Sequence, residues 1–246
     1  MVMDVVVVIP AYNLQGIIGR VVSVAKRHAD VIVGVDVKTK DGTAEEAARA
    51  GAYVVKDAGN GKGAVLRKLF AVALEKKYKY IISMDGDYQD KPEELPNFIS
   101  EVQRADIVSG SRYLARVSRL NLFGMINAIF IKTNKVNVIG NILLFFIINF
   151  FSSGFKFKSW ITDTQSGYRA YRREALAALL PHLCSEKYEI ESEMLFFASR
   201  LGYKIKEIPK HVDIERRGAR LIDGLRIGKY MLKLWLKYLY TQPTIK

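Results

Sequence analysis

The side chains best suited to chemistry follow a short apolar run at residues 80–83. Asp85 and Asp87 come two positions apart after this run, and Gln89 continues the same spacing. Side chains two apart on an extended backbone point the same way, so the two carboxylates and the Gln89 carbonyl oxygen are expected to converge. Such oxygen donors suit a hard cation, Mg²⁺ or Mn²⁺, which keeps open positions for water and phosphate oxygens. A solvated Asp–Gly turn is the alternative interpretation.

The elements that must position these carboxylates are predicted by apolar runs. The runs predict strands at residues 5–9, 31–35, 53–55 and 80–83, with helical patterns between them. This alternation indicates a parallel sheet with right-handed crossovers, whose ligands bind beyond the carboxyl ends of the strands. Asn13, Asp36 and Asp85 each follow a predicted strand, so we expect them to share that edge.

A glycine-rich loop at residues 59–63 carries Lys62 and precedes a predicted helix. Its spacing is not that of a P-loop, and no G-x-G-x-x-G follows the first strand, so neither a P-loop site nor a dinucleotide site is expected. Two interpretations stay open for Lys62: a plain turn before a helix, or a contact with phosphate.

The charge of the chain is unevenly distributed. The 246 residues carry a net charge of +13, and residues 1–110 hold 15 basic and 15 acidic residues, so the excess lies in the second half. This asymmetry indicates an anionic partner for that half. Its basic residues are interleaved with aliphatic runs and match no nucleic-acid motif, so no nucleic-acid partner is expected. The single cysteine, Cys184, excludes a disulfide framework, and the N-terminus does not resemble a signal peptide.

The motifs of the first 110 residues, taken in order, resemble the nucleotide-sugar half of family 2 glycosyltransferases, which have the GT-A fold. The motifs are Pro10-Ala11-Tyr12-Asn13, Asp36, Asp41-Gly42-Thr43, Gly61-Lys62-Gly63 and Asp85-Gly86-Asp87-Tyr88-Gln89. The resemblance implies that the first turn and Asp36 hold the base and ribose of the donor, with Lys62 and Gly86 also at the donor. It implies a metal on Asp85, Asp87 and Gln89 that holds the diphosphate. This chain has Leu14 and Val37 where the family usually has Glu and Asp, which leaves the base open.

Motifs in the second half resemble the dolichyl-phosphate mannosyltransferase branch of that family. Gly110-Ser111-Arg112 is similar to its G-S-R, whose arginine contacts phosphate, and residues 163–172 are close to its D-x-x-S-G-[FY]-R-A-Y-R run. The resemblance implies a catalytic group of Asp87, Arg112, Asp163 and Arg217. It implies that Ser111, Arg112, Gln165 and Ser166 belong to an acceptor site, and the basic residues Lys132 and Lys135 that follow Arg112 are expected to join it. Arg217 and Arg220 would close over the donor diphosphate.

Two stretches of the second half suit a membrane surface. Residues 136–154 carry no charge, and their length is borderline for a membrane span. We expect a helix in the membrane interface, with a re-entrant hairpin with residues 120–131 and a core helix as alternatives. Residues 225–240 have a helical pattern with one basic stripe, formed by Arg226, Lys229, Lys233 and Lys237. This stripe suits an anionic membrane, or the solvated edge of a packed helix.

The sequence therefore predicts an α/β protein of the GT-A type, with a Rossmann-like, mostly parallel sheet flanked by helices and with amphipathic membrane-interface helices. Residues 1–220 would form the glycosyltransferase domain, divided into a nucleotide-sugar half (1–110) and an acceptor half (111–220), and residues 221–246 a basic C-terminal helix. The expected reaction is metal-dependent, inverting transfer of mannose from GDP-mannose to dolichyl or polyprenyl phosphate by a monotopic protein on the cytosolic face of a membrane. The alternatives are transfer of glucose or another hexose from a UDP-sugar, or transfer to a hydroxyl of a lipid-linked sugar with Asp163 as base. The oligomeric state stays open.

Overall fold

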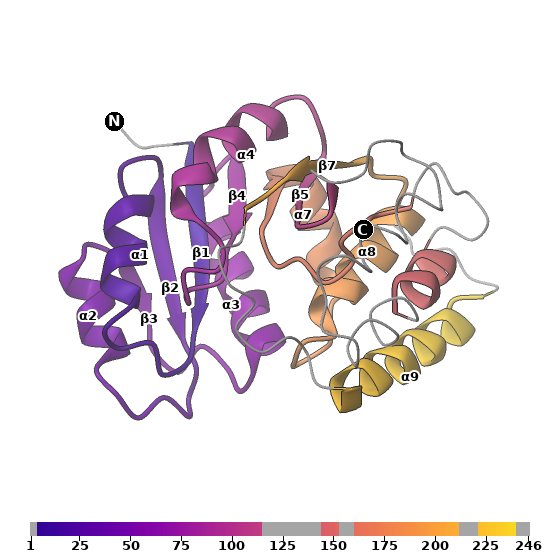
Figure 1. Cartoon of the computed structure of the whole chain (residues 1–246), viewed down its shortest axis with the longest axis horizontal. Helices are drawn as coiled ribbons and strands as arrows, with labels where there is room; N and C mark the ends of the chain where they lie inside the picture. Colours follow the sequence, from indigo (N-terminus) through magenta and orange to yellow (C-terminus); the bar gives the residue numbers. More distant parts are fainter. Residues whose placement is uncertain (1–3, 115–143, 153–159, 212–220, 240–246) are drawn as a thin grey trace.

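A seven-stranded sheet lies at the centre of the computed structural model, which describes residues 4–114, 144–152, 160–211 and 221–239 (Figure 1). The strand order is β3-β2-β1-β4-β6-β5-β7. The strands are β1 (Val5–Ala11), β2 (Asp30–Val35), β3 (Tyr53–Val55), β4 (Tyr80–Ser83), β5 (Ile107–Ser111), β6 (Arg169–Arg172) and β7 (Ile205–Pro209). The four strands predicted from apolar runs are all present.

Strand β6 runs against its two neighbours. It lies between β4 and β5 and is antiparallel to both, with Arg169 opposite Ser83 and Tyr171 opposite Ile107. The other strand pairs are parallel, which confirms the predicted mostly parallel α/β fold. Because β6 is reversed, the loop that precedes it lies at the carboxyl ends of β4 and β5.

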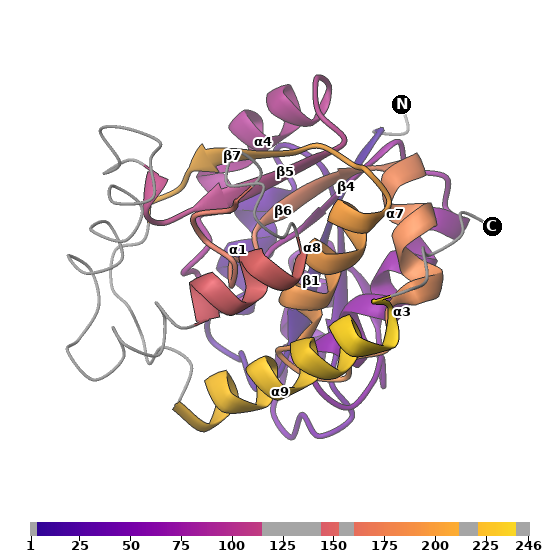
Figure 2. The same ribbon diagram turned by 90° about the vertical axis from the view of Figure 1, so that its right-hand side faces the viewer.

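Helices cover both faces of the sheet (Figures 1 and 2). One face is covered by α1 (Ile18–Ala25), α2 (Thr43–Arg49) and α4 (Leu95–Val102). The other face is covered by α3 (Lys62–Glu75), α7 (Arg173–Leu179), α8 (Ile190–Arg200) and α9 (Leu221–Lys237). Two short 3₁₀ helices, η1 (Pro92–Glu94) and η4 (Leu180–His182), adjoin α4 and α7.

Alternation along β1 explains why its sequence is continuously apolar. Val6 and Val8 belong to the core beneath α3, α7 and α8, whereas Val7 and Ile9 belong to the core beneath α1, α2 and α4. All four side chains are fully buried. A strand covered on both faces needs apolar residues at every position, as the predicted parallel sheet requires.

Residues 144–152 form a helix whose side chains are buried or partly buried. Leu144 and Ile148 belong to the core on the α3 side, and the rings of Phe145 and Trp160 pack edge to face with 5.5 Å between centroids. This is the packing of a core helix. The rest of the predicted interface helix, and residues 120–131 of the hairpin alternative, lie outside the described residues. None of the described helices is long and apolar enough to cross a membrane.

Helix α9 carries two apolar stripes, one packed and one exposed. Ile227, Met231 and Leu234 are buried against the core on the α3 side. The exposed leucines are Leu225, Leu232, Leu236 and Leu239. The four residues of the predicted basic stripe are exposed as well. The helix thus packs on the domain and also presents a basic, apolar surface.

Candidate functional site

Loops that follow or precede four neighbouring strands meet at one edge of the sheet. Asp85 follows β4, Arg112 follows β5 and Lys210 follows β7. The loop before β6 joins them, because Ser83 Oγ donates a hydrogen bond to the Gly167 carbonyl oxygen at 2.7 Å. The reversed strand therefore brings the motif around Asp163 to the carboxylates after β4.

Lys62 bridges two carboxylates at this edge. Its Nζ lies 2.7 Å from Asp85 Oδ1 and 2.7 Å from Glu191 Oε1. Burial opposes the ammonium charge, but the two carboxylates outweigh burial and hold the pKa of Lys62 above its ordinary value. Burial likewise opposes ionisation of Asp85, and Lys62 outweighs it, so the pKa of Asp85 lies below its ordinary value. Lys62 is thus part of the charged cluster.

Two glycines allow α3 to begin close to the backbone of residues 185–187. Gly61 has a φ of +98°, and a Cβ there would lie 2.6 Å from the Glu186 carbonyl oxygen. A Cβ at Gly63 would lie 2.5 Å from the Ser185 carbonyl oxygen. Asp36 fixes the same turn, since its Oδ2 accepts a hydrogen bond from Gly61 N at 2.5 Å. The two glycines and Asp36 therefore fix the start of α3, and with it the position of Lys62.

The residues predicted to hold a nucleotide lie together at the ends of β1 and β2. Asp36 N donates to the Ala11 carbonyl oxygen at 3.0 Å, which places the Pro10–Asn13 turn beside Asp36. Asn13 has a φ of +50°, and its Oδ1 accepts a hydrogen bond from Lys40 N at 2.9 Å. The Tyr12 side chain is 56% exposed and available to a ligand.

Leu14 lies against Gly86, where a Cβ would be 2.7 Å from Leu14 Cδ1. The departure from the family pattern at position 14 therefore places an apolar side chain against the loop that carries Asp85 and Asp87.

Asp87 and Gln89 contact each other. Asp87 Oδ1 accepts a hydrogen bond from Gln89 N at 3.1 Å, and Asp87 Oδ2 accepts one from Gln89 Nε2 at 2.7 Å. Gln89 thus meets Asp87 through its amide nitrogen. Burial raises the pKa of Asp87, and the negative charge of Asp85 raises it further.

Asp85 and Asp87 are suited to a divalent cation. In the described ranges no three His, Cys, Asp or Glu side chains are grouped to hold a metal ion. Mg²⁺, however, is commonly held by one or two carboxylates with substrate phosphates and water. Positive charge relieves the repulsion that raises the pKa of Asp87, and the Lys62 ammonium already lies on Asp85 as a stand-in cation. The pair fits a cation that binds together with a diphosphate.

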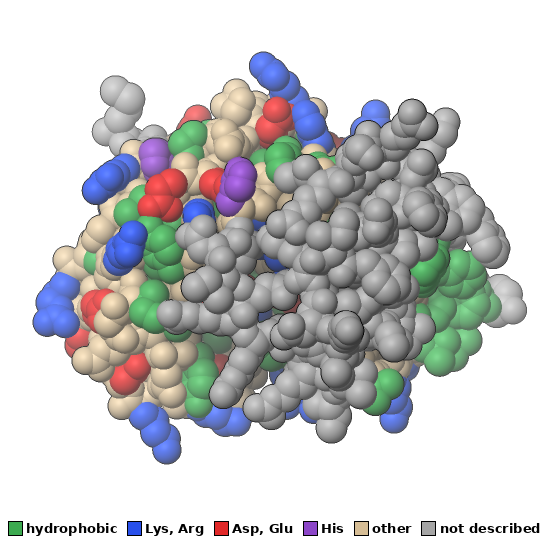
Figure 3. All heavy atoms as spheres, viewed as in Figure 1, with side chains coloured by type: hydrophobic (Ala, Val, Ile, Leu, Met, Phe, Trp, Pro, Cys, Tyr) green, Lys and Arg blue, Asp and Glu red, His purple; other side chains and the backbone are tan. Residues whose placement is uncertain are grey.

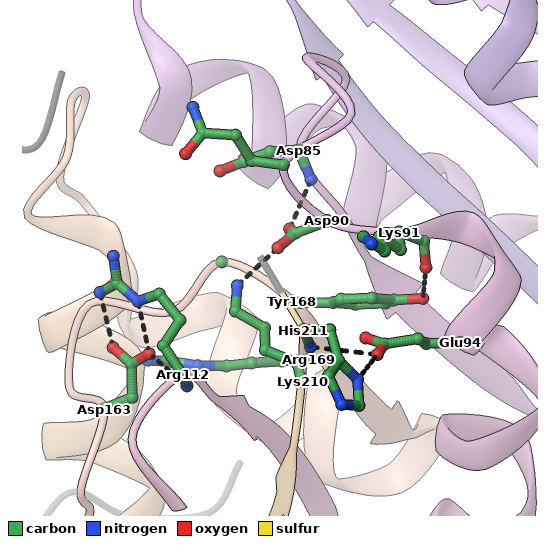
Figure 4. Close-up of polar contacts among 12 residues, drawn as sticks. Asp85, Asp90, Lys91, Glu94, Arg112, Asp163, Tyr168, Arg169, Lys210 and His211 are labelled. Atoms are coloured by element: carbon green, nitrogen blue, oxygen red, sulfur yellow. Dashed lines mark hydrogen bonds and ion pairs between the residues drawn. The ribbon is translucent and has the colours of Figure 1, made fainter. Parts of the chain in front are cut away.

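A second buried ion pair joins β7 to the carboxylate loop. Lys210 Nζ lies 2.5 Å from Asp90 Oδ1, and Asp90 Oδ2 accepts a hydrogen bond from Asp85 N at 2.9 Å. Figure 4 shows Lys210 reaching Asp90 from the side on which Arg112 and Asp163 lie. The positive charge of Lys210 lowers the pKa of both Asp85 and Asp163, after the larger effects of burial and of their own partners.

Arg112 and Asp163 form a two-pronged ion pair (Figure 4). Arg112 Nε donates to Asp163 Oδ2 at 2.7 Å, and an Arg112 terminal nitrogen donates to Oδ1 at 2.9 Å. Burial would raise the pKa of Asp163, but the guanidinium outweighs burial and lowers it to about 2. The structure thus pairs Asp163 with Arg112 through both carboxylate oxygens.

Glu207, in β7, holds the loop that carries Asp163. Its carboxylate accepts hydrogen bonds from Thr162 N at 2.7 Å, Thr162 Oγ1 at 2.9 Å and Asp163 N at 3.0 Å. Burial raises the pKa of Glu207 to about 7, against the effect of these donors. The position of Asp163, and hence of Arg112, depends on this partly buried acid.

A small pocket opens between the Arg112–Asp163 pair and the helix at residues 144–152. Its polar wall includes Arg112, Thr162 and Asp163, and its apolar wall includes Leu144 and Phe145. The pocket lining thus combines a guanidinium with aliphatic and aromatic carbon.

The remaining predicted acceptor residues have different surroundings. Gln165 lines the pocket and donates to Ser192 Oγ at 2.9 Å. Ser111 is buried, and its Oγ lies 2.6 Å from Thr162 Oγ1. Ser166 is also buried. Lys132, Lys135, Arg217 and Arg220 lie outside the described residues.

Comparison with known proteins identifies the family. Residues 6–180 match the model described as Glycosyl transferase family 2. The chain belongs to this family. It is a glycosyltransferase with a GT-A-like fold, as the motifs indicated.

Similar proteins cover nearly the whole glycosyltransferase chain. An undecaprenyl-phosphate mannosyltransferase of Micrococcus luteus is 29% identical, over 94% of this chain and 93% of that protein. A dolichyl-phosphate hexose transferase of Haloferax volcanii is 28% identical, over 95% of each. A solved 4-diphosphocytidyl-2C-methyl-D-erythritol synthase has a TM-score of 0.53 at 16% identity, covering 94% of this chain and 99% of that one, which supports the fold alone.

Four charged residues of this glycosyltransferase site were not singled out from the sequence: Asp90, Glu191, Glu207 and Lys210. Asp90 directly follows the Asp85–Gln89 motif, and Glu191 lies near the start of a helix in an acid-rich pattern. The sequence around Asp90 and Glu191 could therefore have indicated that they belong to the site. Glu207 and Lys210 act through contacts with Thr162 and Asp90, which are distant in the sequence, and no local pattern indicates such pairs.

Proposed function

We propose that this glycosyltransferase moves a sugar, mannose in the first instance, from a nucleotide diphosphate sugar such as GDP-mannose to a polyprenyl or dolichyl phosphate. The observation that carries the proposal is the pocket beside Asp163. Its lining combines the Arg112 guanidinium, which suits a phosphate, with Leu144 and Phe145, which suit an apolar chain. The names of the relatives from Micrococcus luteus and Haloferax volcanii agree with a lipid-phosphate acceptor.

The state of Asp163 favours a phosphate over a hydroxyl as acceptor. A lipid phosphate is an anion near neutral pH and attacks without losing a proton, whereas a sugar hydroxyl needs a base within hydrogen-bond reach. Both oxygens of Asp163 are occupied by Arg112, and its pKa of about 2 makes it a weak base. Its role in the proposal is to orient Arg112 toward the acceptor phosphate.

The donor diphosphate is assigned to the opposite side of the site. Asp85 and Asp87 would hold a divalent cation, Mg²⁺ or Mn²⁺, which supplies positive charge against the charge that grows on the leaving diphosphate. Tyr12, Asn13 and Asp36 line the edge beside this position and would receive the nucleotide. Attack from the Arg112 side, away from the leaving group, agrees with inversion at the anomeric carbon. Holding both substrates in line supplies much of the rate.

A membrane surface is the proposed location of the acceptor. Apolar side chains gather at the edge of the molecule where α9 and residues 144–152 lie (Figure 3). On α9 the exposed leucines stand among exposed lysines, which suits the apolar and anionic layers of a membrane interface. We assign the protein to the cytosolic face, where nucleotide sugars are supplied, as a monotopic or peripheral enzyme.

A donor screen tests the proposal. Purified protein is incubated with polyprenyl phosphate and either GDP-mannose or a UDP-hexose, with and without EDTA, and the lipid product is measured. We expect mannosyl transfer that EDTA abolishes reversibly and that Asp87→Asn abolishes without loss of fold. Asp57→Asn makes the same change at an exposed acid outside the proposed metal site, and this control should retain activity. Full activity in EDTA would contradict the metal assignment, and transfer from a UDP-hexose alone would contradict the donor assignment.

A further inference from the structure

Lys62 and Asp85 form an ion pair in the position that a divalent cation would share. The Lys62 Nζ lies 2.7 Å from Asp85 Oδ1, and its side chain is only 16% exposed. Gly167 closes the other side of the pair, since a Cβ at this position would lie 2.9 Å from Lys62 Nζ and 3.3 Å from Asp85 Oδ1. An ammonium at this distance repels a second cation from the same oxygen.

Glu191 gives Lys62 a second anchor. Its side chain is 6% exposed, and its Oε1 lies 2.7 Å from Lys62 Nζ. Apart from Lys62, neither oxygen of Glu191 has a hydrogen-bond donor in the described part of the chain. A buried carboxylate left without a partner is costly, so Glu191 holds Lys62 in place. Asp85, by contrast, also has Lys210 and Arg112 nearby, so it can exchange Lys62 for another cation.

We propose that Lys62 and the divalent cation compete for the carboxylate of Asp85, and that Glu191 retains Lys62 when the cation binds. This inference rests on the proposed function, which places the cation on Asp85 and Asp87. When the cation takes Asp85, the Lys62 ammonium keeps a partner, because Glu191 Oε1 also lies 2.7 Å from Nζ. The start of α3, fixed by Gly61 and Gly63, limits how far Lys62 can move.

The competition makes cation binding depend on the donor. Without donor, the cation must displace the ammonium and binds weakly. The negative charge of a bound diphosphate favours the state in which the divalent cation, rather than Lys62, occupies Asp85. Cation and donor therefore strengthen each other's binding.

Mn²⁺ binding to the donor-free protein, measured by calorimetry, tests the inference. Lys62→Met removes the competitor and should tighten Mn²⁺ binding about fivefold or more. Glu191→Gln is isosteric and leaves Asp85 as the main partner of Lys62, so it should weaken Mn²⁺ binding by a similar factor. The double variant, Lys62→Met with Glu191→Gln, decides between competition and a simple effect of net charge. Under competition, Glu191→Gln weakens binding much less once Lys62 is absent, whereas a net-charge effect gives the same factor in both backgrounds.

Two further variants keep the result interpretable. Lys62→Gln retains a polar side chain and should behave like Lys62→Met, and melting curves report whether each variant is folded. If substitutions at position 62 do not fold, Glu191→Gln alone decides, because an affinity equal to that of wild type contradicts the proposal. Lys206→Met removes a surface cation that pairs with Glu101, and an equal gain in affinity there would also contradict the proposal.

These results are separate from those that test the proposed function. Absence of Mn²⁺ binding in wild type and in every variant contradicts both the inference and the metal assignment. Failure to use a lipid phosphate contradicts the proposed acceptor and leaves the binding measurements unchanged, because no acceptor is present in them.

Discussion

Lys210 and Asp90, 120 residues apart in the sequence, form a buried ion pair with 2.5 Å between Nζ and Oδ1. Their side chains are 6% and 2% exposed. The second oxygen of Asp90 accepts the backbone N–H of Asp85 at 2.9 Å. The pair therefore connects the end of β7 to the loop that carries Asp85 and Asp87.

Removal of one partner of this pair should destabilise the fold. Lys210→Met leaves Asp90 buried without its cation, and we expect a loss of about 3 kcal/mol or more in the free energy of unfolding. Lys206→Met is the matched control, because Lys206 lies on β7, the strand that Lys210 follows, and pairs with Glu101 at 2.5 Å on the exposed surface. We expect a loss below about 1 kcal/mol there. Urea unfolding measures both, and equal losses would contradict the assignment.

The pair of Asp163 with Arg112 should appear in the response to acid. The folded-state pKa of Asp163, about 2, lies below the ordinary value of 3.8. The stabilisation is therefore complete above about pH 4 and is lost as the pH falls toward 2. Asp163→Asn lacks this group, so its unfolding free energy should fall less than that of wild type over that range. Parallel curves for the two proteins in acid denaturation would show that the pair is not formed.

Titration of Glu207 should change the stability of the fold in the opposite direction to that of Asp163, and at higher pH. Burial raises its folded-state pKa from 4.5 to about 7, so the folded protein favours the protonated form. Stability from this group is complete below about pH 4.5 and is lost as the pH rises through 7. Glu207→Gln should flatten the dependence of Tm on pH between these values. Glu101→Gln, at a surface acid whose pKa is lowered, should leave the slope in that window unchanged. A slope retained in Glu207→Gln would contradict the assignment.

The sequence predicted the first four strands well for a physical reason. A strand buried on both faces of a parallel sheet must be apolar at each position, and β1 has this pattern without interruption from Val6 to Ile9. Strand β6 was different. Residues 169–172 were interpreted as part of a functional motif. Their local sequence does not indicate that they form a strand between β4 and β5 in the reverse direction.

In the site, too, some features could be predicted from the sequence and others could not. Asp85, Asp87, Arg112 and Asp163 stand in ordered motifs, and their positions could be predicted from those motifs. The contacts that fix them could not, because Lys62 reaches Glu191 and Lys210 reaches Asp90 only after folding. Pairing of charges far apart in a sequence depends on the topology of the sheet.

The exposed surface of α9 should bind anionic membranes. Replacement of Lys229, Lys233 and Lys237 by Glu should reduce sedimentation with phosphatidylserine vesicles, and high salt should reduce that of wild type, because both weaken attraction to the surface. The same change at Lys68, Lys76 and Lys79, which are exposed on and after α3, is the control and should have a smaller effect. Equal recovery of wild type in the supernatant with and without vesicles would contradict a membrane-surface enzyme.

The most direct test of the account is the choice of acceptor by the purified enzyme. Transfer of labelled mannose from GDP-mannose is measured with polyprenyl phosphate, with polyprenol and with a lipid-linked sugar. The account predicts transfer to the phosphate alone. Arg112→Ala should raise KM for polyprenyl phosphate about tenfold or more, because a charge-assisted contact to the acceptor is lost. KM for the donor should stay near that of wild type. Extension of the lipid-linked sugar without use of polyprenyl phosphate would contradict the account and would assign Asp163 as the base.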